Sequence, residues 1–227
     1  MDLAPCASGR GSAHSTILPM RTLAPDVHQL RGLPPNTINV YLVNGVLVDA
    51  GTPAARWRIL RELRGREVGA HVVTHAHPDH FGSSNAVCRT LGLPLWTGER
   101  DAEAVETARP VTARGRPSAL LARMMPPGHP VARPLREGDE VQGFTVLDVP
   151  GHSPGHIALW RESDRTLLCG DVFFNLRRLG PPPAFLTFDP ERNRESMRRL
   201  AALRPALVLF GHGPPLRDPD RLAHVAG

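Results

Sequence analysis

Lysine is absent from this sequence, and all 27 basic residues are arginines. Complete replacement of lysine, together with 24 prolines and 21 glycines, indicates a coding bias toward GC. The arginines are scattered along the chain and form no basic block. The net charge of +5 therefore gives little support for a nucleic-acid partner, and we do not expect one.

Cysteine is also scarce, with only Cys6, Cys88 and Cys169. An odd number without paired spacing does not indicate a disulfide framework, and no two cysteines are close enough for a CxxC zinc site. A reducing, cytoplasmic setting is the simplest expectation. Cys169 ends an apolar run two residues before Asp171, and we interpret it as a small buried apolar side chain.

Long apolar runs are missing as well. None approaches the ~20 residues that cross a bilayer, so we expect no membrane contact. Residues 1–20 lack the basic stretch and apolar block of a secretory signal. We predict that residues 1–22, rich in small and polar side chains, form a flexible tail. Residues 23–227 are enough for one buried core and are expected to form a single domain.

Short apolar runs bounded by turn residues recur along the chain and predict β-strands. Two of them, residues 38–43 and 46–48, flank Asn44-Gly45, which is a strong signal for a tight hairpin. Thr52-Pro53 then predicts a helix start, and the apolar residues that follow form a stripe of Trp57, Leu60 and Leu63. A strand over residues 70–74 and a helix over 78–91 are expected next.

The second half of the chain repeats this alternation, with strands predicted over residues 144–149, 157–160, 166–169 and 206–210. A helix with Asp189 as N-cap and Pro190 at its first position should end at Pro205. Residues 99–136 are the least regular segment, with helices expected near 101–108 and 118–125. Strands in groups with helices between them predict a layered α/β or α+β domain.

Five of the apolar runs end in a metal-capable or acidic residue. Side chains at the ends of neighbouring strands converge on one edge of a sheet, where ligand sites of layered folds are commonly built. The five ends carry five of the eleven histidines, too many for accidental capping of strands. The residues concerned are Asp49, then His75 with His77, Asp79 and His80, then His152, Asp171 and His212.

The spacing within the second of these ends fits metal binding. His75 and His77 are two residues apart, so extended backbone places both imidazoles on one side. Asp79 and His80 follow where a helix is expected to begin, and they point to a second position nearby. Imidazole and carboxylate ligands suit Zn, Fe or Mn, and the absence of thiolate argues against a purely structural zinc.

Taken in order, the motifs resemble those of the metallo-β-lactamase fold superfamily, and most closely its glyoxalase II-like hydrolases. The resemblance covers about residues 23–217 and implies a four-layer αββα sandwich. It rests on Val48-Asp49-Ala50-Gly51, Thr74 to His80, Gly151-His152-Ser153-Pro154-Gly155-His156, Gly170-Asp171 and Gly211-His212.

The resemblance also implies a dinuclear metal site, with zinc expected first and iron or manganese as alternatives. His75, His77 and His152 would hold the first ion, and Asp79, His80 and His212 the second. Asp171 would bridge the two ions, and Asp49 would orient a ligand. The carboxylates expected to serve catalysis are therefore Asp79, Asp171 and Asp49.

With that site, the resemblance implies hydrolysis by a hydroxide shared between the ions, which attacks a small ester, thioester or related carbonyl compound. The positive site would favour an anionic substrate or a developing oxyanion. Phosphodiester hydrolysis is one alternative. A mononuclear iron enzyme similar to the persulfide dioxygenases is another, and a non-catalytic metal-binding module is a third.

Other residues narrow the choice of substrate. Asp171 at the bridging position counts against a β-lactamase, because the β-lactamases of this fold usually lack an aspartate there. The lactonases that resemble this site use a tyrosine beyond that aspartate as an acid. The single tyrosine here, Tyr41, lies inside an early strand and cannot take that role. We expect His156 to be a buried support rather than a ligand. Arg177 and Arg178 are interpreted as surface residues, with a substrate clamp as the alternative. Residues 99–136 are expected to form an insertion that covers the pocket.

Overall fold

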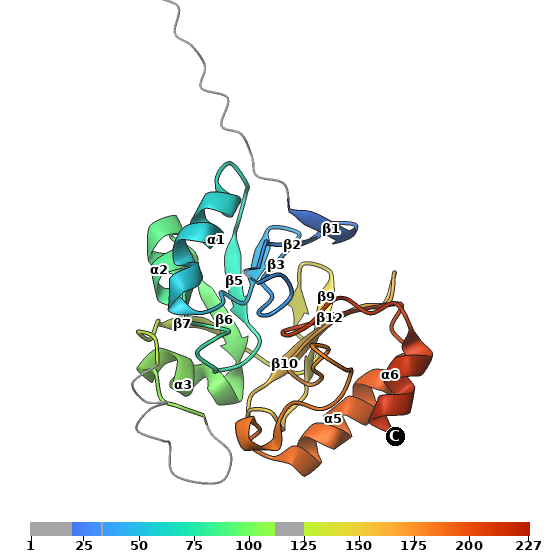
Figure 1. Cartoon of the computed structure of the whole chain (residues 1–227). Coiled ribbons are helices and arrows are strands. Elements are labelled where there is room, and N and C mark those ends of the chain that lie inside the picture. Colours follow the sequence, from blue (N-terminus) through green and yellow to red (C-terminus); the bar gives the residue numbers. More distant parts are fainter. Residues whose placement is uncertain (1–19, 33, 112–124) are drawn as a thin grey trace, which may run out of the picture.

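A computed structural model describes residues 20–32, 34–111 and 125–227. Two β-sheets pack face to face, and helices cover the outer face of each sheet (Figure 1). The architecture is the predicted four-layer αββα sandwich. In the described part of the chain, no helix combines the length and apolar character needed to cross a membrane.

In the described part of the chain, the first sheet has seven strands in sequence order. Its first four strands pair antiparallel, and β4 to β7 pair parallel. The strands are β1 (Arg21–Ala24), β2 (Val27–Gln29), β3 (Tyr41–Val43), β4 (Val46–Val48), β5 (Ala70–Val73), β6 (Leu95–Gly98) and β7 (Val131–Leu135).

The second sheet, as far as the structure describes the chain, has five strands in the order β12-β11-β10-β9-β8. The β11–β12 pair is parallel, and the other pairs are antiparallel. The strands are β8 (Glu140–Val141), β9 (Phe144–Asp148), β10 (Ile157–Arg161), β11 (Thr166–Gly170) and β12 (Leu207–Phe210).

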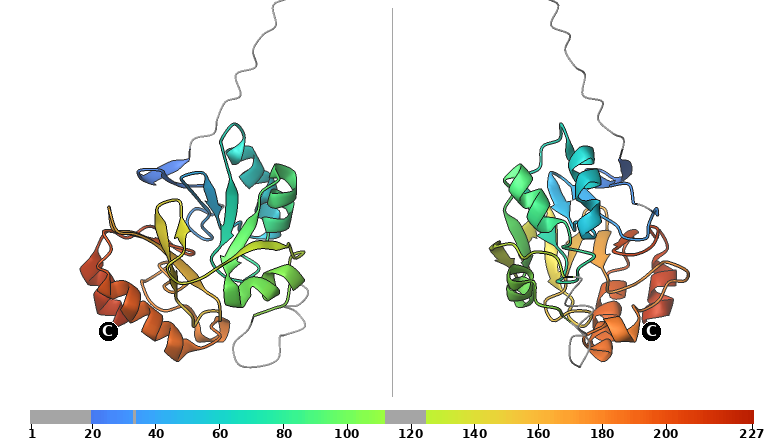
Figure 2. Two further views of the ribbon diagram at one scale, coloured as in Figure 1. Left: turned by 180° about the vertical axis from the view of Figure 1, so that it is seen from behind. Right: turned by 60° about the vertical axis from the view of Figure 1, so that its left-hand side comes forward.

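The helices lie outside the two sheets. Helices α1 (Arg56–Leu63), α2 (Ser84–Leu91) and α3 (Ala102–Thr107) cover the first sheet. Helices α5 (Pro190–Ala202) and α6 (Pro219–Ala226) cover the second (Figure 2). Among the described residues, three short 3-10 helices lie in connecting segments: η1 (Pro53–Ala55), η2 (Glu99–Asp101) and η3 (Ala184–Leu186).

Successive side chains of a strand point to opposite faces of its sheet, and here they are apolar on both faces, which explains why both faces of each sheet are covered. In β4, Val46 and Val48 point into the layer between the sheets, whereas Leu47 packs under the helices of the first sheet. In β11, Leu168 joins the central layer, and Leu167 packs beneath α5 and α6. Strands that are apolar on both faces are stable only when both faces are buried, so the sequence requires an outer helix layer.

Most of the predicted elements are present. Asn44 and Gly45 have φ angles of 42° and 77° and form the tight turn between β3 and β4. Asp189 caps α5 by accepting a hydrogen bond from the backbone N of Arg192 at 3.1 Å. Helix α3 falls within the expected range 101–108. The helix expected near residues 118–125 lies almost wholly outside the described residues.

Three expectations need correction. The helix predicted from residue 78 begins only at Ser84, because residues 78–83 form turns that aim Asp79 and His80 at the other strand ends. Trp57 does not belong to the buried stripe of α1, because its side chain is 70% exposed; Ile59 is buried in its place, and Leu63 is buried as predicted. Strand β1 begins at Arg21, inside the segment expected to be a tail.

The segment 99–136 is also more than a cover. It includes η2, α3 and the edge strand β7 of the first sheet, so much of it belongs to the sandwich itself. Among its described residues, Val111 faces the predicted site, with its carbonyl oxygen 3.2 Å from Nε2 of His77, and residues 112–124 lie outside the described part of the chain.

Candidate metal centre

The five predicted strand ends meet at one edge of the sandwich. Asp49 follows β4, His75 and His77 follow β5, and His152, Asp171 and His212 follow β9, β11 and β12. The two sheets contribute to the same place because their strands end side by side. Within the described residues, three groups of side chains place their ligand atoms within 4.8 Å of one another: His75–His77–His152, His75–His80–Asp171 and Asp79–His80–His212.

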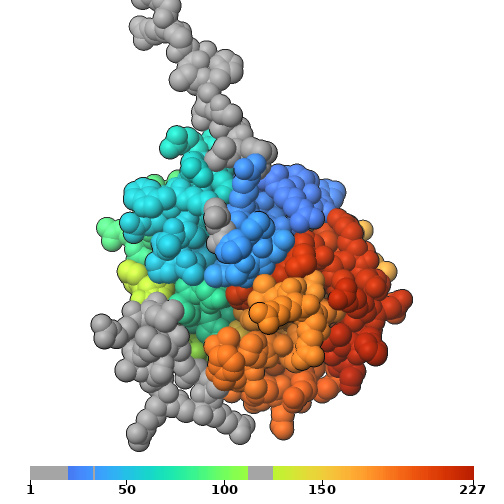
Figure 3. Space-filling view, in the orientation of Figure 1, coloured from blue at the N-terminus to red at the C-terminus, as the bar shows by residue number. Residues whose placement is uncertain are grey.

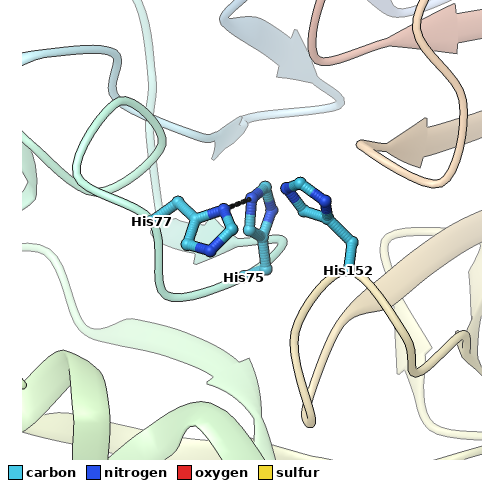
Figure 4. Close-up of side chains that lie close together, drawn as sticks. All are labelled: His75, His77 and His152. Carbon is cyan, nitrogen blue, oxygen red and sulfur yellow. Dashed lines mark hydrogen bonds between the residues drawn. The ribbon is translucent and has the colours of Figure 1, made fainter. Parts of the chain in front are cut away.

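The first group consists of three imidazoles. His75 Nε2 and His77 Nδ1 are 3.1 Å apart, and the His152 ring reaches them from the loop after β9 (Figure 4). Its centroid lies 4.9 Å from that of His75 and 4.5 Å from that of His77. Three nitrogens that face one point form the open triangle needed to hold a metal ion with a further position free.

Asp79, His80 and His212, called the second group from here on, combine a carboxylate with two imidazoles. Nε2 of His212 lies 3.2 Å from Oδ2 of Asp79 and 3.4 Å from Nε2 of His80. The opposite nitrogen of each ring is held: Nδ1 of His212 donates to the carbonyl of Thr37 at 2.5 Å. Nδ1 of His80 lies 2.7 Å from Oδ2 of Asp49. These contacts leave Nε2 of both rings directed at the centre.

Asp171 lies between the two groups. Its Oδ2 is 3.3 Å from Nε2 of His152 in the first group, and 3.2 Å from Nε2 of both His80 and His212 in the second. Its Oδ1 is buried without a hydrogen-bond partner among the described residues, as is Nε2 of His152. Buried polar atoms without hydrogen-bond partners are uncommon in proteins. A cation bound between these residues would satisfy both atoms.

The charges of the site fit metal ions. Burial lowers the pKa of His75 well below its usual value, and burial together with His152 lowers the pKa of His77 to about 3. Both rings are therefore neutral and can donate lone pairs. Burial acts in the same direction on His212, but Asp171 raises its pKa to about 10. Protons on the second group thus balance the negative charge of the buried carboxylates. Bound divalent cations would balance that charge in their place.

Two further residues support the ligands. His156 is buried, and its Nε2 accepts a hydrogen bond from the backbone N of Asp171 at 3.0 Å, which agrees with the expected supporting position. Gly211 lies against the same carboxylate. A Cβ on Gly211 would collide with Oδ1 of Asp171 and would come within 2.6 Å of Cε1 of His80. Only glycine permits this close approach.

Asp101 is a site residue that sequence reasoning missed. It is fully buried, and its carboxylate accepts hydrogen bonds from the backbone N of Ala76, the hydroxyl of Ser153 and the backbone N of Gly155. In the sequence Asp101 is one acidic residue at a predicted helix start, a place where such residues are common. No spacing signal connects it to the histidine motifs.

A cavity of about 440 Å³ opens onto the metal-binding groups. His77, Asp79, His152, Asp171 and His212 contribute to one wall. The other walls are mainly apolar and are formed by Pro53, Pro78, Val111, Phe174, Leu176, Phe185 and Leu186. Figure 3 shows the orange surface of residues near 170–190 beside the blue and teal surface of the N-terminal half of the described chain.

The family model of the metallo-beta-lactamase superfamily matches residues 33–212 of this chain. The chain belongs to the metallo-β-lactamase superfamily. It is 30% identical over 224 residues to Probable metallo-hydrolase YflN of Bacillus subtilis, covering 82% of this chain and 84% of that protein. It is therefore a metal-dependent hydrolase of the superfamily.

Other superfamily members are similar over much of the chain. The hydroxyacylglutathione hydrolase of Bdellovibrio bacteriovorus is 29% identical over 171 residues, which cover 73% of this chain and 56% of that enzyme. The structure of TTHA1623 in a di-iron-bound form is 31% identical, with a TM-score of 0.67, and covers 92% of this chain and 98% of that one. BJP-1 of Bradyrhizobium japonicum, a subclass B3 metallo-β-lactamase, shares the fold at 22% identity and a TM-score of 0.67.

Several residues that the sequence offered as possible site residues lie away from the metal-binding groups of this superfamily member. The hydroxyl of Tyr41 is buried and donates to the carbonyl of Phe210 at 2.8 Å, so it does not face the cavity. Arg177 and Arg178 are exposed and do not line the cavity. Cys169 is buried as expected, and burial raises the pKa of its thiol.

Proposed function

We propose that this protein hydrolyses a small ester or thioester at a pair of divalent metal ions. His75, His77 and His152 would hold the first ion, and Asp79, His80 and His212 the second. The observation that carries this proposal is the position of Asp171, whose Oδ2 contacts imidazoles of both groups. A carboxylate placed in this way suits a ligand shared by two ions.

Zinc is our first candidate, and iron or manganese are the alternatives, because nitrogen and oxygen ligands accept all three. Two bound ions would activate a water molecule and polarise a carbonyl oxygen. The chain's own residues prepare the site for this chemistry. Asp49 and Thr37 orient the rings of His80 and His212, and the apolar walls of the cavity would limit the access of water to a bound reacting group.

The cavity supports a carbonyl substrate over a phosphodiester. Proteins that act on nucleic acids rely on arginine and lysine near the phosphates. Among the described residues that line this cavity, none is an arginine. The proposal of a small-molecule substrate therefore agrees with the character of the walls.

The test is a panel of substrates with protein that has been stripped of metal by a chelator and reloaded with Zn, Fe(II) or Mn. We expect turnover of thioesters or esters, and little turnover of bis-p-nitrophenyl phosphate. Turnover of the phosphodiester alone would overturn the proposal. Oxygen consumption with a persulfide and one iron per chain would favour the persulfide dioxygenase alternative instead.

Two variants provide the controls. His77→Ala removes a ligand of the first group and should abolish turnover, whereas Arg178→Ala changes an exposed residue outside the cavity and should leave turnover unchanged. Equal activity of His77→Ala and the unmodified protein would contradict a role for the metal centre in catalysis.

A further inference from the structure

Large apolar side chains gather on the surface beside the metal centre. Six such side chains are exposed among the described residues, and four of them lie close together in sequence, at Leu176, Phe185, Leu186 and Phe188. Phe185 is 78% exposed. Scattered exposed apolar residues are ordinary, but a group of them at one place indicates a binding surface.

This apolar group is continuous with the cavity. Leu176, Phe185 and Leu186 line the same cavity as the metal-binding residues. The segment that carries Phe185 is fastened to the loop of His152, since the backbone N of Phe188 donates to the carbonyl of His152 at 3.1 Å and that of Asp189 donates to Gly151 at 2.8 Å. The apolar surface is thus held at a fixed place next to a proposed ligand of the first ion.

We infer that the substrate carries an uncharged, apolar chain or ring on one side of its scissile ester or thioester bond. This inference rests on the proposed function and adds the substrate class. The cavity, at about 440 Å³, falls within the ~300–1,000 Å³ usual for small-molecule sites, so it has room for a group of medium length. None of the described lining residues is an arginine that would pair with a charged group on that chain.

The experiment measures kcat/KM for p-nitrophenyl acetate, butanoate and hexanoate, and for alkyl acetates of increasing length. We expect kcat/KM to rise about fourfold per added methylene in one of the two series, the change expected when each methylene is buried. A double variant, Leu176→Ser with Phe185→Ser, should flatten this dependence. Trp57→Ser, which removes a 70% exposed apolar side chain outside the cavity, should preserve it.

The outcomes separate the two proposals. Metal-dependent turnover of acetate esters without any dependence on chain length would overturn the apolar site and leave the hydrolase proposal standing. Equal flattening in Trp57→Ser and the double variant would also overturn the apolar site. The absence of metal-dependent turnover with every ester and thioester would overturn both.

A second inference rests on a different observation, the contacts of Asp101. The loop after β5 carries His75 and His77, and the loop after β9 carries His152. Asp101 joins these loops: Oδ2 accepts from the backbone N of Ala76 at 2.8 Å and from the Ser153 hydroxyl at 2.5 Å, and Oδ1 accepts from the backbone N of Gly155 at 2.7 Å. A Cβ on Gly155 would collide with the backbone N of Asp101, so the second loop packs directly on η2.

The geometry points to Asp101 as a positioning residue for the first metal ion. Its hydrogen bonds go to Ala76, Ser153 and Gly155 rather than to the proposed ligands, so it holds the two loops whose imidazoles form the first group. Asp49 has the corresponding place at the second group, because it contacts His80 directly. Asp49 also accepts hydrogen bonds from Thr74, whose hydroxyl lies 3.0 Å from Nδ1 of His75, so it reaches the first group only through Thr74. This inference, too, rests on the proposed binding of two ions.

The test is the affinity of each ion, measured by competition with a chelating indicator and by the absorption of bound Co(II). In Asp101→Asn, an amide NH₂ replaces an oxygen that faces a hydrogen-bond donor. We expect the first ion to bind about 10–100-fold more weakly, and the second to keep its affinity within about threefold. Ser153→Ala removes only one of the three donors and should give a smaller change in the same direction, even if Asp101→Asn folds poorly.

Asp164→Asn is the matched control. Asp164 also accepts from a backbone N, that of Thr166 at 3.2 Å, but it lies outside the metal-binding groups. It should leave both affinities unchanged. A general loss of structure would weaken both ions together, so an equal fall in the two affinities, or no change in either, would overturn the inference.

Discussion

The carboxylate of Asp49 lies 2.7 Å from Nδ1 of His80 and also accepts hydrogen bonds from the backbone N and the hydroxyl of Thr74. Nδ1 of His80 therefore carries a proton, and Nε2 is left to face Asp171. Asp49 itself has a φ of 60°, a left-handed conformation that aspartate and asparagine tolerate better than most residues. One strained residue thus fixes both the backbone after β4 and the ring of a proposed ligand.

Replacement of Asp49 should weaken the binding of the second metal ion more than that of the first. In Asp49→Asn the backbone conformation remains accessible, but the charge that holds His80 is lost. We expect about a 10–100-fold lower affinity for the second ion, with a smaller fall for the first, which Asp49 reaches only through Thr74. Titration with an indicator measures this effect, and Asp101→Asn serves as the reciprocal comparison. Equal losses at both ions would contradict the stronger support that Asp49 gives to the second group.

Gly211 should not tolerate a side chain. A Cβ there would collide with Oδ1 of Asp171, a buried carboxylate held from several sides, so we expect Gly211→Ala to lose metal affinity and turnover by at least tenfold. Gly69→Ala is the control, because a Cβ at Gly69 meets no atom within 4 Å. Thermal unfolding and metal content of both variants check the prediction. Normal metal content in Gly211→Ala would contradict it.

His156 should prove to be a support and not a ligand. Its Nε2 accepts from the backbone N of Asp171, so this lone pair is engaged. We expect His156→Gln to bind two ions per chain with reduced affinity, since glutamine offers an oxygen as a replacement acceptor. Metal analysis at saturating metal measures the stoichiometry. A single ion per chain in this variant would show that His156 is a ligand.

His71 should make the fold sensitive to acid. It is fully buried between Leu47 and Ser84, and burial lowers its pKa from 6.5 to about 4. Between those two values the unfolded chain binds a proton that the folded chain does not, so stability falls as the pH drops from 6.5 toward 4. This group alone should lower the free energy of unfolding by about 3 kcal/mol across that range.

The measurement compares the free energy of unfolding of the unmodified protein and His71→Asn at several pH values in this window, with excess chelator present so that metal release does not contribute. The variant is expected to be less stable at neutral pH, because it loses packing, but its stability should change less with pH. Parallel pH dependences of the two proteins would rule out His71 as the source of the effect.

The sequence by itself determined the local elements and the chemical kinds of the proposed ligands. The Asn44-Gly45 turn and the Asp189 cap form as predicted, because each depends on a few neighbouring residues. The histidine and aspartate positions at strand ends were also readable, since strand polarity brings such ends to one edge. Strands β4 and β11 carry apolar residues on both faces, so each sheet likewise required an outer layer of helices.

Only the tertiary structure decided the rest. The delayed start of α2 at Ser84 depends on turns that bring His80 to Asp49, a partner 31 positions earlier in the chain. Asp101 acquires its role through donors on two loops, and the cavity's apolar wall joins Pro53 to Phe185. Hydrogen bonds and burial of this kind act between segments far apart in sequence, so a local sequence pattern does not predict them.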